Sequence, residues 1–115
     1  MKKLLVVLFS VLLLAGCGKK VESNKELLDI KNNNNYIIVD VRTPEEYQEG
    51  HLKDAINIPY DTIAEPMDLD KSKMILVYCK SGQRSNIAYD KLRGIGYRVY
   101  DMGAYDKITE FEKVK

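Results

Sequence analysis

A lone cysteine opens the segment of this 115-residue chain that is best suited to chemistry. Cys79 directly follows an apolar, β-branched run at 74–78 and precedes a segment with helical character. A helix N-terminus offers unpaired backbone N–H groups and a partial positive charge, which lower the pKa of a thiol and favour a bound anion. The pattern predicts a nucleophilic cysteine at the carboxyl end of a strand. The alternative is a buried, inert thiol.

The loop after Cys79 supplies further groups for an anionic substrate. Gly82 permits a backbone conformation that bulkier residues resist, so the N–H groups of the loop can converge on the sulfur or on an anion. Lys80 and Arg84 add two cations, and the planar fork of Arg84 suits an oxyanion such as a sulfonate. These cations could instead be solvated surface charges, and Ser85 could merely cap the helix. The expected substrate-binding residues are Lys80, Ser81, Gly82, Gln83, Arg84 and Ser85.

The elements around this loop alternate between strands and helices. Capping-box patterns at 23–26 and 43–46 predict a helix to about residue 31 and a short helix closed by Gly50. Further expected elements are strands at 36–41, 55–58, 74–78 and 97–100, a helix at 85–93, and an amphipathic helix at 105–113 with Ile108 and Phe111 on one side. The alternation predicts an α/β fold, a three-layer sandwich with a central, mainly parallel sheet flanked by helices. Ligands of such sheets bind beyond the carboxyl ends of the strands, where Cys79 lies.

The first sixteen residues have the pattern of an export signal. Lys2 and Lys3 form a basic start, an apolar run follows at 4–14, and small residues precede Cys17. The run is too short to span a bilayer permanently, and the segment resembles the lipobox of bacterial lipoproteins. We therefore expect cleavage after residue 16, lipid on Cys17, a polar tether at 17–24, and a domain at 25–115 that faces outward from a bacterial membrane. The alternative is an ordinary cysteine beside a cleaved signal or a short anchor.

Charge and cysteine content exclude several classes of function. The chain has 18 basic and 17 acidic residues, a formal net charge of +1, with no basic block and no zinc-type spacing. We therefore expect no nucleic-acid partner and no metal. With Cys17 lipidated, Cys79 is the only free thiol, which excludes an intramolecular disulfide and a CxxC redox pair.

Several separated motifs together resemble a single-domain rhodanese over roughly residues 25–115. They are Asp40-Val41-Arg42, Glu46-Tyr47, Gly50-His51-Leu52, the run at 55–59 and the loop at 79–85. The resemblance implies a sulfurtransferase in which the Cys79 thiolate takes a sulfane sulfur from an anionic donor such as thiosulfate and passes it to a thiol or cyanide. It implies no cofactor, and we expect a monomer. The chain departs from the family pattern at Gly103-Ala104 and Ile108, where many relatives carry a double glycine and a tryptophan.

Three residues outside the loop are expected to frame the site. His51 follows a helix-ending glycine, so ordering hydrogen bonds are expected of it more than the work of a general base. Asp40 and Arg42 stand at the carboxyl end of a predicted strand and could line the site, but we expect buried pairing or capping among Arg42, Glu46 and loop backbone.

Two other functions stay open from the sequence. A phosphatase or arsenate reductase of related fold also uses a cysteine thiolate at a helix start, but five residues separate its cysteine from its arginine. Only four separate Cys79 from Arg84, which favours sulfur over phosphate. A non-catalytic or sulfur-carrier module would keep the fold as a docking surface for a protein partner.

Overall fold

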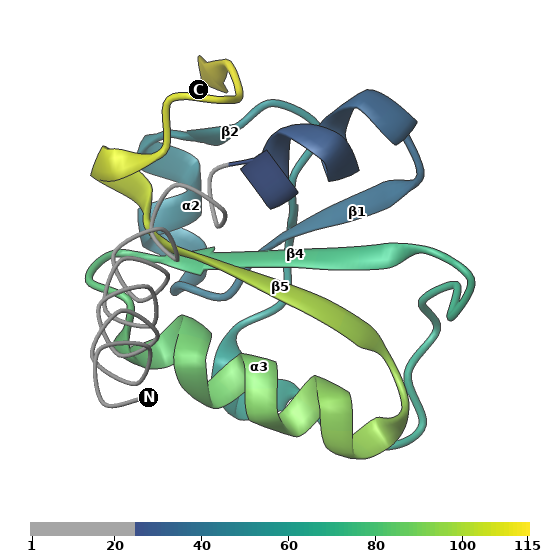
Figure 1. Cartoon of the computed structure of the whole chain (residues 1–115). Helices are drawn as coiled ribbons and strands as arrows, with labels where there is room; N and C mark the ends of the chain where they lie inside the picture. The colour runs from purple at the N-terminus through teal and green to yellow at the C-terminus, as the bar shows by residue number, and fades with distance from the viewer. Residues whose placement is uncertain (1–24) are drawn as a thin grey trace, which may run out of the picture.

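Four parallel strands form the main sheet, in the order β3-β1-β4-β5 (Figure 1). They are β1 (Tyr36–Asp40), β3 (Ile56–Asn57), β4 (Met74–Cys79) and β5 (Arg98–Ala104). The computed structural model describes residues 25–115. The signal peptide, the lipid site at Cys17 and the tether predicted before residue 25 lie outside the described residues. The predicted α/β class with a central parallel sheet is confirmed.

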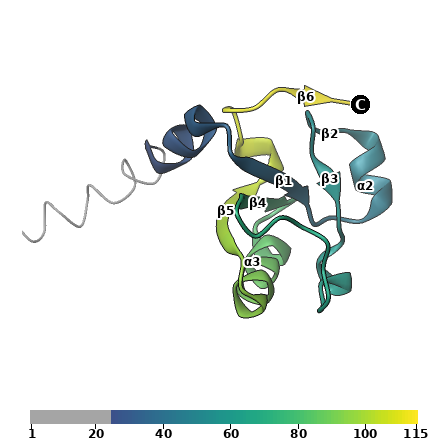
Figure 2. The same ribbon diagram turned by 90° about the vertical axis from the view of Figure 1, so that its right-hand side faces the viewer.

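Helices cover both faces of this sheet (Figures 1 and 2). One face carries α3 (Gln83–Ile95), and the other carries the helical segment 25–33 and α2 (Pro44–Glu49). Local sequence sets their ends: the Thr43 hydroxyl accepts from the backbone of Glu46 to begin α2, and Gly96, at φ 112°, ends α3. The predicted helices at 43–50 and 85–93 are therefore present, the second beginning two residues earlier than expected.

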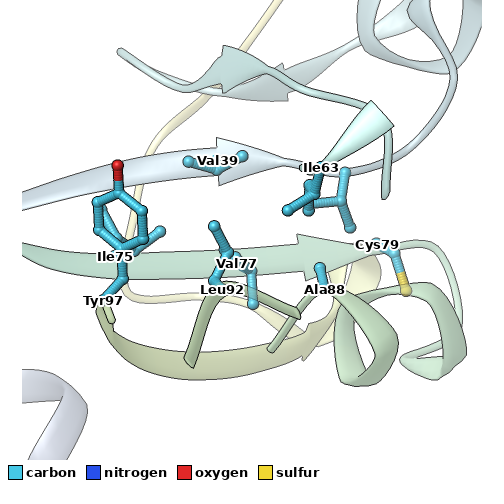
Figure 3. Close-up of a cluster of buried hydrophobic side chains, with 9 residues drawn as sticks. Val39, Ile63, Ile75, Val77, Cys79, Ala88, Leu92 and Tyr97 are labelled. Carbon is cyan, nitrogen blue, oxygen red and sulfur yellow. The ribbon is translucent and has the colours of Figure 1, made fainter. Parts of the chain in front are cut away.

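The two faces of β4 bury different side chains. Ile75, Val77 and Cys79 belong to the apolar cluster against α3 (Figure 3), and Leu76 and Tyr78 belong to the cluster on the opposite face. Successive side chains of a strand point to opposite faces. The last residue of β4 therefore directs its thiol toward the face on which α3 begins.

The predicted C-terminal helix at 105–113 is wrong. Residues Tyr105–Lys107 form a single 3₁₀ turn, η2, and Lys113–Val114 (β6) pairs antiparallel with His51–Leu52 (β2). Ile108 is nevertheless buried, and Phe111 packs against the same apolar cluster. The apolar residues of this segment are thus buried although the segment is not helical. Their contacts with the rest of the fold outweigh the local helix propensity.

The other differences from the expected elements are small. β5 runs to Ala104, four residues beyond the expected end, with a register shift opposite Val77 and Tyr78 of β4. A 3₁₀ turn, η1 (Tyr60–Thr62), lies in the irregular connection before β4. Among residues 25–115, no helix combines the length and the apolar character needed to cross a membrane.

Candidate active site

The Cys79 sulfur lies inside a ring of backbone donors. Its Sγ accepts hydrogen bonds from the N–H of Gly82 at 2.9 Å and the N–H of Ser85 at 3.2 Å. Gly82 stands at the N-cap of α3 with φ 102°. A side chain there would meet no atom within 4 Å, so the glycine is required for its backbone angle and not for space. The backbone N–H groups at the start of α3 thus point toward the thiol of Cys79.

These donors make the thiol more acidic than an ordinary cysteine. Burial of the side chain raises its pKa, but hydrogen bonds from Ser85 and from the backbone of Gly82 and Ser81 outweigh burial, and the pKa of Cys79 is lowered overall. The Ser85 hydroxyl donates to the Gly82 carbonyl oxygen at 3.1 Å. It therefore shares its single proton between that oxygen and the sulfur, and the backbone N–H groups are the constant donors.

Three residues of the predicted substrate loop lie at the surface. Lys80, Ser81 and Gln83 are exposed, whereas Ser85 is buried. Within the described part of the chain, the Lys80 ammonium has no hydrogen bond and no ion pair. It is therefore available to an anion that approaches the loop.

Arg84 is not available in the way the sequence suggests. Its two terminal nitrogens, Nη1 and Nη2, donate to Glu46 Oε1 at 2.7 Å and Oε2 at 3.0 Å, so the carboxylate takes the bidentate edge formed by these two nitrogens. Both side chains are about one quarter exposed, at 25% and 24%. The hydrogen bond from Arg84 lowers the pKa of Glu46 to about 2, against an ordinary 4.5, with further help from Thr43. Sequence reasoning missed this partner because it assigned Glu46 to the helix cap and to Arg42, whereas Arg84 lies 38 positions away in the chain.

A second arginine pair, Asp40 with Arg42, is buried. Asp40 accepts from the backbone N–H of Arg42, from its guanidinium at 2.6 to 3.1 Å, and from the Tyr78 hydroxyl at 2.8 Å. Arg42 also donates to the Gly50 carbonyl oxygen at 2.7 Å and lies 4.4 Å from the centre of the Tyr105 ring. Buried pairing of Arg42 was predicted with Glu46, but Asp40 takes that place. Asp40 ends β1 and lies two residues before Arg42, and alternate residues of an extended chain lie on the same side.

His51 has a structural position. Its Nδ1 lies 2.8 Å from the Tyr47 carbonyl oxygen, and because that oxygen only accepts, Nδ1 donates. The ring stacks on Tyr47 with the ring centres 3.8 Å apart. The imidazole thereby ties the end of α2 to the start of β2.

A shallow depression of about 220 Å³ lies beside the loop. It is lined by Arg42, Glu46, Glu49, Gly50, Lys80, Tyr105 and Asp106. Among its charged side chains, Lys80, Glu49 and Asp106 have no ion-pair partner within residues 25–115. A larger hollow of about 410 Å³ is lined by residues that include Tyr36 and Phe111. It lies at the start of β1, which pairs with the start of β4, whereas Cys79 is at the end of β4. Of these hollows, the depression is the one that a residue of the loop lines, through Lys80.

No metal site accompanies this arrangement in the part of the chain that the structure describes. Over residues 25–115, no group of three or more His, Cys, Asp or Glu side chains could hold a metal ion. A buried, acidified thiol held by N–H groups at a helix start, beside a cationic side chain, is suited to attack on an anionic, electrophilic sulfur.

Comparison with known proteins identifies the family. The chain belongs to the rhodanese-like domain family, whose model matches residues 23–110. It is similar to thiosulfate sulfurtransferase PspE of Escherichia coli (strain K12), with 36% identity over 80 residues that cover 67% of this chain and 77% of that protein. A solved structure described as a rhodanese with anions from E. coli superimposes with a TM-score of 0.64 at 37% identity, and covers 70% of this chain and 98% of that chain.

A second curated relative is a thiosulfate:glutathione sulfurtransferase of Saccharomyces cerevisiae. It is 33% identical over 81 residues, which cover 58% of this chain and 58% of the yeast protein. The chain therefore spans little more than half the length of that relative. At the level of the family, it belongs with sulfurtransferases, whose substrates are a sulfur donor and a sulfur acceptor.

Proposed function

We propose that this protein moves a sulfane sulfur from an anionic donor such as thiosulfate to a thiophilic acceptor through a persulfide on Cys79. The observation that carries the proposal is the Sγ atom held by the N–H groups of Gly82 and Ser85 at the start of α3. Those donors stabilise the attacking thiolate, and they can equally stabilise the terminal sulfur of a persulfide in the same place.

The proposed reaction has two displacement steps. The Cys79 thiolate attacks the outer sulfur of thiosulfate, a new S–S bond forms, and sulfite leaves with the electron pair of the broken bond. A thiolate or cyanide then attacks the outer sulfur of the persulfide, and Cys79 leaves as a thiolate. No net oxidation occurs, and the second step regenerates the starting charge on Cys79. Lys80 would guide the donor to the loop.

Intact mass spectrometry tests this proposal directly. The purified full-length chain is incubated with thiosulfate, and one added sulfur atom is expected on the protein. Cys79→Ser should gain none, whereas Cys17→Ser should load normally. Cyanide should then remove the sulfur as thiocyanate. A chain that gains no sulfur from thiosulfate, polysulfide or a thiosulfonate would contradict the proposal and would favour a protein-docking module.

We also propose that the domain acts outside the cytoplasm, anchored through lipid on Cys17. The support is the tripartite pattern of residues 1–17, in which a basic start, an apolar run and small residues precede the cysteine. Diacylglycerol on the thiol with a further acyl chain would supply the chains that stable anchoring requires. Metabolic labelling with palmitate should mark the wild-type chain and not Cys17→Ser; equal labelling of both would contradict this proposal.

A further inference from the structure

The Glu46 carboxylate occupies the anion-binding fork of Arg84. Two hydrogen bonds, of 2.7 and 3.0 Å, join the two side chains in a bidentate pair. A fork of this kind is the arrangement by which arginine binds an oxyanion such as a sulfonate. A donor that sought the same contact would therefore have to displace Glu46.

Arg84 lies close enough to the reacting sulfur for its charge to matter. It directly precedes Ser85, whose N–H binds Cys79 Sγ at 3.2 Å. Hydrogen bonding to Glu46 raises the pKa of Arg84, burial opposes this, and the negative charge of the Cys79 thiolate adds to the rise. The guanidinium thus stays positive, and Glu46 offsets its charge and takes two of its five N–H donors, one on each terminal nitrogen.

Glu46 is held in place independently of Arg84. Its Oε1 atom also accepts from the Thr43 backbone N–H at 3.1 Å and from the Thr43 hydroxyl at 3.2 Å, as part of the capping box that begins α2. The carboxylate is therefore positioned by the helix start before it meets the guanidinium. This prior ordering reduces the entropy that the ion pair must overcome.

The loop is consequently less cationic than its sequence suggests. Of its two cations, only Lys80 has no ion-pair partner within the described residues. Thiosulfate carries two negative charges, and a thiosulfonate such as methanethiosulfonate presents the same sulfane sulfur with one. We propose that Glu46 determines donor specificity by occupying Arg84, so that the site favours monoanionic sulfur donors over dianionic ones. This inference rests on the proposed function and names the class of donor for the same site.

Both donors load Cys79 by the same balanced step. The thiolate attacks the outer sulfur, the new S–S bond forms, and the bond to the sulfonyl sulfur breaks. Sulfite leaves from thiosulfate and methanesulfinate leaves from methanethiosulfonate, each with the electron pair. Any difference in kcat/KM between the two donors therefore reflects how the site recognises the sulfonate or sulfonyl end of the donor.

The test compares Glu46→Gln with Glu45→Gln in the full-length chain. Glutamine preserves the capping box and removes only the charge, and Glu45 is an exposed carboxylate one residue away that does not contact Arg84. At low salt, Glu46→Gln should raise the ratio of kcat/KM for thiosulfate over methanethiosulfonate by about three- to tenfold, mainly through KM for thiosulfate. The rise should shrink as salt is added. Glu45→Gln should leave the ratio near the wild-type value.

The inference would be overturned if the ratio of kcat/KM for thiosulfate over methanethiosulfonate stayed the same or fell in Glu46→Gln. An equal rise of this ratio in Glu46→Gln and Glu45→Gln would also overturn it. Failure of the proposed function has a different signature, since wild-type Cys79 would then gain no sulfur from either donor. Intact mass after single loading separates these cases.

Discussion

The chain holds two arginine–carboxylate pairs at the same edge of the sheet, and their surroundings differ. Asp40 ends β1 and Arg42 follows it, and they are 0% and 6% exposed, whereas Glu46 and Arg84 are about one quarter exposed. The buried pair is also held by neighbours, since the Tyr78 hydroxyl donates to Asp40 and Arg42 donates to the Gly50 carbonyl oxygen. The outer pair is partly exposed to solvent, and its Arg84 directly precedes Ser85, whose N–H binds Cys79 Sγ.

Because of this difference, loss of one partner should have different consequences in the two pairs. A buried charge that loses its partner has no water to replace it, so the fold itself must respond. A partly exposed charge is rehydrated at small cost, so its loss changes the local field more than stability. We therefore expect the Asp40 pair to support the framework of the site and the Glu46 pair to adjust its chemistry.

The largest effect is expected from Asp40→Asn. The change leaves the Arg42 guanidinium buried without a counter-charge and weakens the contact to the Tyr78 hydroxyl. The free energy of unfolding should fall by about 3–5 kcal/mol. Urea unfolding at neutral pH measures this, and a loss below that of Glu46→Gln would break the comparison.

Tyr78→Phe should have the next largest effect. The hydroxyl donates to Asp40 and accepts from the buried backbone N–H of Leu52 at 3.0 Å. Burial raises the pKa of this hydroxyl, so it stays protonated and remains a donor at neutral pH. Removal of the hydroxyl should cost about 1–3 kcal/mol, because the Leu52 N–H loses its partner. A change within the error of urea unfolding would contradict the role given to this network.

Glu46→Gln makes in the outer pair the same change from carboxylate to amide that Asp40→Asn makes in the buried pair. Its cost at neutral pH should be at most about 1 kcal/mol, since solvent screens a pair that is one quarter exposed. The pKa of Glu46 is about 2 in the folded chain against an ordinary 4.5, so its contribution is complete above 4.5 and is lost as the pH falls toward 2. The wild type and Glu46→Gln should therefore converge in stability over that window. A difference that persists at the acid end would contradict this account.

Ser85→Ala should have the smallest effect, and it acts on the thiol. The hydroxyl is one of several donors that lower the pKa of Cys79, and the backbone N–H of residue 85 remains after the substitution. The pKa should rise, and alkylation by iodoacetamide at pH 7 should slow by no more than a few-fold. An alkylation profile that moves to lower pH would show that the hydroxyl does not stabilise the thiolate.

Local pattern predicted much of the fold and the centre of the site. A β-branched run ending at Cys79, a glycine and a helix start are adjacent in the chain, so short-range rules place the thiol at a helix mouth. The C-terminal segment was wrongly predicted because the spacing of Ile108 and Phe111 fits either a helix or an irregular segment packed on the sheet. The pairing of β6 with β2 joins residues about sixty positions apart, which no local rule describes.

By itself, the sequence determined the strand–loop–helix that carries Cys79, because backbone angles and N–H directions follow from neighbouring residues. Only the tertiary structure decided which carboxylate meets each arginine. Glu46 and Arg84 are 38 positions apart, and Arg42 meets Asp40 because β1 and the loop after it turn both side chains into the same enclosed space. Ion pairs depend on distances set by packing, and the available charge beside the thiol is therefore a property of the folded chain.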